Sequence, residues 1–198
     1  MKRDWIQSFS ATQIFPRDMT RSVFTVEDVA QGLGKRCRFT GQCQHFYSVA
    51  EHSVLGAEAL LESTGDKQLA AAFLMHDVSE AFLPDVPTPL KHFLSVELDN
   101  NTSCNWSELE SLHTLEILER FGLGALLPAI DSPLIHEMDL AMLQAERDFL
   151  HGPPPMPWGI LTPRAAISLR CLAPLEAVAQ WRSAFQKFCA PLQDLKGW

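Results

Sequence analysis

Two histidines and two aspartates could do chemistry in this sequence of 198 residues, because all four fall in segments whose other residues have apolar side chains at helical spacing. They are His52, the adjacent pair His76 and Asp77, and Asp139. Taken alone, each is more often a solvated or hydrogen-bonded side chain than a ligand. Taken together, imidazole nitrogens and carboxylate oxygens suit a borderline or hard divalent cation, such as Zn, Mn, Co, Ni or Fe. We therefore treat the four residues as one candidate metal site.

A helix predicted over residues 66–83 carries the central pair. Phe73 marks its inward face, and the same row continues into His76, Asp77 and Glu80, where it changes from apolar to ionisable. A buried carboxylate without a partner is costly, so such residues usually converge on each other or on a cation. Adjacent residues of a helix point about 100° apart, so both members of the pair can reach one metal only at the edge of the helix.

The other two candidates lie on two further predicted helices. The first covers residues 48–62, opens with the capping-box pattern Ser-x-x-Glu, and has His52 on its apolar face. The second covers residues 133–150 and has Asp139 on the face marked by Met142. Three separate helices would thus have to bring the four side chains together.

The rest of the sequence predicts an all-α protein. Further helices are expected over residues 25–34, 106–121 and 174–188, and only residues 13–15 have a weak extended pattern. The length allows one substantial core. We expect a single-domain helical bundle over residues 1–198, with a core of about 15–150 and a C-terminal helical extension over 158–198.

Composition excludes several classes of protein. The net charge is −8 and the longest basic cluster is Lys35, Arg36 and Arg38, which argues against a nucleic-acid polymer as partner. No apolar run approaches the roughly 18 residues of a membrane span, and the N-terminus lacks the apolar run of a secretory signal. Five scattered cysteines fit a reducing compartment. We expect a soluble cytoplasmic protein without membrane contact.

A small zinc site is an alternative use for some of these cysteines. Cys37, Cys43 and His45 are close in the sequence, but their spacing matches no common zinc module. Reduced, partly buried thiols are the favoured interpretation.

Three segments around the candidate ligands resemble those of a known family. They are FYSVAEHS over residues 46–53, LMHDVSEA over residues 74–81 and DVPTPLK over residues 85–91. This pattern resembles the HD-domain phosphohydrolases, in particular the branch with bacterial 5′-deoxynucleotidases and phage deoxynucleotide phosphohydrolases. The resemblance extends from about residue 15 to residue 150, and its segments are specific in combination and weak singly.

The resemblance implies an HD-type all-α fold and a catalytic divalent metal that serves in the hydrolysis of phosphate from a nucleotide. Glu80 would position or deprotonate the attacking water, and Asp85 matches a further acidic position near the metal and the sugar. An arginine ahead of the first histidine contacts phosphate in that branch. Arg38 is the best match, with Arg36 close enough to leave the assignment open. The resemblance also favours a homo-oligomer.

Other residues follow from the chemistry that a nucleotide needs. Lys91, with Arg38, would neutralise charge on the phosphate, and a second ion, Mg or Co, could enter with the substrate. Phe39 could stack on a base, although a core phenylalanine is an equal reading.

Several functions stay open at this level. One is a 5′-nucleotidase acting on deoxynucleoside monophosphates, and another is a triphosphohydrolase such as the dATP-removing enzymes of phages. A different class is an inactive HD protein that binds a nucleotide as a sensor. A purely structural helical module would bind no metal at all.

Overall fold

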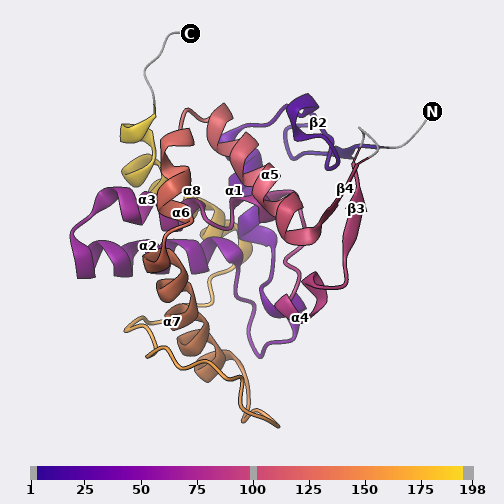
Figure 1. The fold of residues 1–198 in the computed structure, drawn as a ribbon. Helices are drawn as coiled ribbons and strands as arrows, with labels where there is room; N and C mark the ends of the chain where they lie inside the picture. Colours follow the sequence, from indigo (N-terminus) through magenta and orange to yellow (C-terminus); the bar gives the residue numbers. More distant parts are fainter. Residues whose placement is uncertain (1–3, 99–101, 194–198) are drawn as a thin grey trace.

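The computed structural model describes residues 4–98 and 102–193, and its chain is mostly helical (Figure 1). The helices are α1 (Val26–Lys35), α2 (Val49–Thr64), α3 (Lys67–Met75), α4 (Thr88–Lys91), α5 (Trp106–Arg120), α6 (Leu127–Ile130), α7 (Pro133–Leu150) and α8 (Pro174–Phe188). Short 3-10 helices are η1 (Met19–Arg21), η2 (Phe39–Gly41), η3 (Val78–Ala81), η4 (Gly124–Leu126) and η5 (Ala190–Leu192). The expectation of a helical protein is confirmed at this level.

Two short antiparallel hairpins accompany the helices. Strand β1 (Ile6–Gln7) pairs with β2 (Gln13–Ile14), at the place where the sequence has its weak extended pattern. Strand β3 (Ser95–Glu97) pairs with β4 (Ser103–Asn105), in a stretch for which the sequence predicts no element. Neither hairpin belongs to a larger sheet in the described part of the chain.

Capping residues fix where the helices begin. Thr25 and Asp28 form the capping box of α1, and Gly65 ends α2 in the left-handed conformation that glycine adopts without strain. At α2 the capping box is only half made, because Ser48 Oγ accepts from the Glu51 N–H but the Glu51 carboxylate does not return to the cap. It accepts instead from the backbone N–H groups of residues 170–172. Glu51 thus fastens the segment before α8 to the start of α2.

The prediction of one helix over residues 66–83 is wrong for the second half of that range. Asp66 caps α3 as expected, but α3 ends at Met75 and the chain continues as the short turn η3. Asp77 has φ −97° and ψ 19°, which is not helical. This break removes the constraint that adjacent helical side chains diverge, and it allows His76 and Asp77 to point toward the same place.

The core lies where α2, α3, α1 and α8 pack together. Gly56 allows α2 to pack closely against α3, because a Cβ at that position would lie 2.0 Å from the Phe73 ring. Trp181 of α8 is fully buried, so the C-terminal helix is part of the core. Of the extension expected over residues 158–198, helix α8 covers only 174–188 and the stretch before it is not regular. The ends of the expected domain, residues 1–3 and 194–198, lie outside the described residues.

Helix α7 extends away from this core, and the orange segment that follows it runs back along its side (Figure 1). The Gln144 side chain donates to the carbonyl oxygens of Ile160 and Thr162, and Ala165 N–H donates to the Ala141 carbonyl. Among the helices described, none combines the length and the apolar character that crossing a membrane requires.

Candidate metal centre

The four predicted ligands come together from α2, the end of α3 and α7. His52 Nε2 lies 3.6 Å from Asp77 Oδ2 and 3.4 Å from Asp139 Oδ1. His76 Nε2 lies 3.3 Å and 3.9 Å from the same two oxygens, and the two Nε2 atoms are 3.5 Å apart. Each imidazole therefore faces both carboxylates.

These separations match what one small cation requires. Ligand atoms at about 2.0–2.2 Å from a tetrahedral ion are about 3.3–3.6 Å from one another. His52, His76 and Asp77 form a group whose ligand atoms all lie within 4.8 Å of one another, so this group could hold a metal ion. Asp139 stands outside that compact group but lies within 3.9 Å of both imidazoles.

Hydrogen bonds on the far edge of each ring orient the two histidines. His76 Nδ1 lies 2.6 Å from the Phe73 carbonyl oxygen, so this nitrogen carries the hydrogen and Nε2 keeps a lone pair. His52 Nδ1 lies 2.6 Å from Glu146 Oε1. Metal-binding histidines are typically held in this way by a carbonyl or carboxylate on the other ring nitrogen.

Glu146 is the residue of this cluster that the sequence interpretation missed. It is fully buried on α7, where Oε1 accepts from the Tyr47 hydroxyl at 3.0 Å and Oε2 lies 3.1 Å from Arg38 Nη2. A signal was present in the sequence: Glu146 follows Asp139 by two helical turns and shares its face.

The charge balance of this cluster favours a divalent cation. Asp77, Asp139 and Glu146 contribute three carboxylates, against which Arg38 is the one guanidinium within 4.0 Å in the described chain. With neutral imidazoles, two negative charges are left over. Burial and Arg38 act to lower the pKa of His52, yet Glu146 and Asp139 outweigh them and raise it to about 9. Without a cation, a proton on His52 thus makes up part of the deficit.

Arg38 and Arg36 differ in what they contact. The buried Arg38 bridges the cluster, with Nη1 3.4 Å from Asp77 Oδ2 as well as its contact to Glu146. Arg36 instead donates from Nε to the Glu80 backbone carbonyl at 2.6 Å. Of the two, Arg38 is the one that reaches the candidate ligands.

Glu80 is buried on η3, and within the described chain its Oε2 has no hydrogen-bond partner. Burial raises the pKa of Glu80 well above its usual value, and the nearby charges of Asp77 and Asp85 raise it further. The surroundings of Glu80 therefore disfavour its charged form.

Asp85 and Phe39 contact each other. Asp85 Oδ2 accepts from the Phe39 N–H at 3.2 Å. Phe39 and Thr40 have positive φ angles of 56° and 51°, a conformation that costs a non-glycine residue free energy and is found at functional loops. The Phe39 ring packs edge-on against His151, with 4.8 Å between ring centroids.

A pocket of about 780 Å³ opens beside the cluster, with His76, Asp77 and Lys91 in its lining. Lys91 Nζ lies 2.9 Å from Glu110, which also lines the pocket. Its walls combine polar and apolar side chains, among them Asn105, Ser107, Ser111, Leu112, Leu115 and Ile130. Phe39 is not among the described lining residues.

The cysteine alternative does not assemble a metal site in the described residues. Cys37 Sγ and Cys43 Sγ are 3.7 Å apart, but Cys43 Sγ donates to the His45 carbonyl oxygen at 3.0 Å. The described chain has one compact ligand group, and it is the histidine–aspartate group.

Two curated proteins are similar to this chain over most of its length. The uncharacterized protein YfdR of Escherichia coli is 32% identical over 143 residues, which are 72% of this chain and 70% of that protein. The chain belongs to the YfdR family. An uncharacterized protein of Rhodobacter capsulatus is likewise 32% identical, over 157 residues that are 77% of this chain and 76% of that protein. No family model matches the chain. The family is thus shared with proteins whose names state no activity, and function has to be argued from the site.

Proposed function

We propose that this YfdR relative is a metal-dependent phosphohydrolase of the HD-domain type, acting on a nucleotide. The observation that carries the proposal is the convergence of two imidazole nitrogens and two carboxylates, with each nitrogen within 3.9 Å of both carboxylates. A spare pair of negative charges and a large adjacent pocket support it. The order of these ligands along the chain, His, then His-Asp, then Asp, also resembles the HD motif.

The residues present fit a divalent transition metal, because both Nε2 atoms are oriented inward by hydrogen bonds at Nδ1. His52, His76, Asp77 and Asp139 would hold it. A mixed nitrogen and oxygen donor set suits Zn, Mn, Co, Ni or Fe. When bound, such an ion supplies a Lewis acid for a phosphate oxygen and lowers the pKa of water.

Side chains of the chain would then accept the proton of the attacking water and balance the negative charge of the phosphate. Glu80, with its raised pKa, accepts a proton from the attacking water. Arg38 holds Asp77 and Glu146 in place and adds positive charge beside the site, where charge on the phosphate builds up. Lys91, at the pocket wall, places a positive charge beside the phosphate or the leaving group.

The adjacent pocket supports a small-molecule substrate of nucleotide size. A volume of about 780 Å³ lies in the range of about 300–1,000 Å³ that such sites have. Its polar side chains offer hydrogen bonds to a sugar or base, and its leucines and isoleucine offer an apolar surface to a ring.

The test is a panel of deoxynucleoside mono- and triphosphates with Mn, Co, Mg and Zn, with phosphate, pyrophosphate and tripolyphosphate measured separately. Phosphate from monophosphates would identify a 5′-nucleotidase, and tripolyphosphate a triphosphohydrolase. Asp77→Asn is the matched inactive control. Elemental analysis of the purified protein would identify the metal. Bound nucleotide without product under every metal would overturn hydrolysis in favour of a sensor, and absence of metal binding would overturn both.

A further inference from the structure

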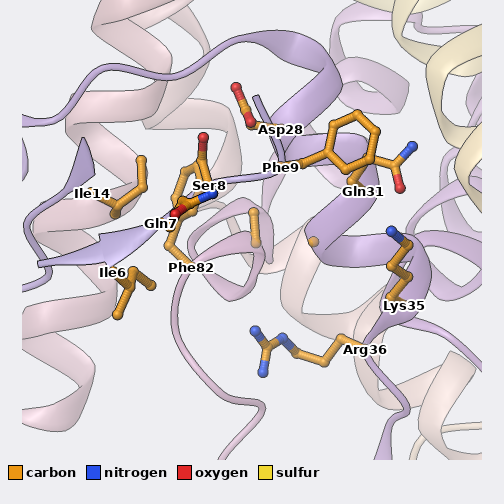
Figure 2. Close-up of a pocket in the computed structure, with 12 residues that line it drawn as sticks. Ile6, Gln7, Ser8, Phe9, Ile14, Asp28, Gln31, Lys35, Arg36 and Phe82 are labelled. Atoms are coloured by element: carbon orange, nitrogen blue, oxygen red, sulfur yellow. The ribbon is translucent and has the colours of Figure 1, made fainter. Parts of the chain in front are cut away.

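A second cavity, of about 430 Å³, shares no lining residue with the pocket beside the metal centre. It lies between the β1–β2 hairpin, one face of α1 and the end of η3 (Figure 2). We call it the hairpin cavity. Its volume is within the range of small-molecule sites.

Two cations occupy one side of the hairpin cavity. Figure 2 shows Lys35 and Arg36 there, both from the C-terminal end of α1. Within the described residues, neither forms a salt bridge, although the charges of Glu80 and Asp85 act on Arg36 from farther away. Lys35 Nζ lies 5.0 Å from the centre of the Phe9 ring, which also lines the cavity. Arg36 is half-buried, and its Nε is fixed on the Glu80 carbonyl, so the rest of the guanidinium is oriented in advance.

The acidic residue of the cavity does not neutralise these cations. Asp28 lines the cavity, but its Oδ1 accepts from Ser10 N–H at 2.7 Å. Its Oδ2 accepts from both the N–H and the hydroxyl of Thr25, at 2.8 and 2.7 Å. Asp28 is therefore committed to the cap of α1 and forms no ion pair with Lys35 or Arg36.

The opposite side of the hairpin cavity is apolar. Ile6, Ile14 and Phe82 lie across from the two cations (Figure 2). Ile6 is 45% exposed, whereas Ile14 is fully buried, so Ile6 offers the accessible part of this wall. This arrangement suits a ligand with a charged end and an apolar end.

A buried acceptor beside the cavity also lacks a donor. Gln31 lines the cavity, and its Nε2 donates to Glu27 Oε1 at 2.7 Å. The Gln31 Oε1 is consequently turned away from Glu27 and has no partner in the described chain. An unsatisfied buried acceptor costs free energy that a ligand N–H or O–H could recover.

We propose that the hairpin cavity binds a small organic anion. Its phosphate, sulfonate or carboxylate group lies between Lys35 and Arg36, and its apolar or aromatic body packs on the opposite wall. The site is separate from the metal centre and does not depend on the proposed hydrolase function.

The test uses naphthalene-2-sulfonate as probe and isoleucine methyl NMR of the full chain as readout. Saturable shifts are expected at the Ile6 and Ile14 methyl groups, which line the cavity, and not at Ile117 or Ile135, which do not. Inorganic sulfate lacks the apolar ring and neutral 2-naphthol lacks the anionic group, so each should bind at least about tenfold more weakly. Equal binding of 2-naphthol would overturn the role of the two cations.

Variants separate this site from its alternatives. Lys35→Gln should weaken probe binding by about five- to tenfold, because it removes one of the two positive charges that would hold the anion. Lys35 is exposed and its ammonium lies over the Phe9 ring, so the change leaves the buried core intact. Lys187→Gln, at an exposed position near the end of α8, is the matched control and should bind the probe normally. Asp77→Asn should also leave the Ile6 and Ile14 shifts unchanged. Absence of saturable shifts at these methyl groups, or equal affinity in Lys35→Gln, would overturn the proposal.

Discussion

Glu146 Oε1 lies 2.6 Å from His52 Nδ1, on the ring nitrogen opposite the one that faces Asp77 and Asp139. Both residues are fully buried, and Glu146 also receives the Tyr47 hydroxyl and the Arg38 guanidinium. One carboxylate thus fixes the orientation of a candidate ligand and neutralises the arginine beside it.

Glu146→Gln should weaken metal binding about 10- to 100-fold, because the amide keeps the shape of the carboxylate but loses its charge toward His52 and Arg38. Isothermal titration with Zn or Mn measures the change. Glu137→Gln, at an exposed position of the same helix, is the matched control. Unchanged affinity in Glu146→Gln would mean that His52 is not oriented through Glu146.

Removal of metal by a chelator should lower the unfolding temperature. The reason is that the surplus negative charge of a largely buried cluster then loses its divalent counter-ion, and a proton on His52 makes up only part of it. Re-addition of the ion should restore stability in the native protein. His76→Ala should abolish this response, whereas His136→Ala, at an exposed position of α7, should keep it. A native protein whose unfolding is indifferent to chelation would argue against a metal centre.

Glu80→Gln should retain metal and lose about 10²- to 10⁴-fold in turnover, if Glu80 takes the proton of the attacking water. Burial, then Asp77 and Asp85, raise the pKa of Glu80 above the ordinary 4.5, so its proton-accepting form becomes scarce as pH falls through the raised value. kcat/KM should therefore rise with pH across that value. Asp85→Asn removes a negative neighbour, lowers the pKa of Glu80 and should move this rise to lower pH. A pH profile that is the same in Asp85→Asn would contradict the assignment.

Lys91→Met should raise KM for a nucleotide about tenfold and leave metal binding intact, because Lys91 lines the pocket and is not among the candidate ligands. Steady-state kinetics and metal titration measure the two effects separately. Lys67→Met, at an exposed position at the start of α3, controls for loss of surface charge. If KM stays the same, Lys91 serves only as the partner of Glu110.

Local chemistry in the sequence determined much of the helical framework. Proline at the first helical position placed the starts of α7 and α8, and the side chains of Thr25, Ser48 and Asp66 placed the starts of three other helices. Such signals depend on neighbours within one turn, so they can be read without the fold. The four candidate ligands were readable for the same reason, as ionisable residues within apolar helical rows.

The tertiary structure decided what those side chains meet. Helix α3 ends at Met75, and the η3 segment that follows packs against α1, where Gly32 allows the Ala81 carbonyl to approach closely. No local pattern in the sequence predicts this break. No local pattern predicts the contact between Glu146 and His52 either, because they are 94 residues apart in the chain. The sequence determined which residues could bind a cation, and only the packing of three helices decided that they face one another, because contacts between distant residues are set by the whole core.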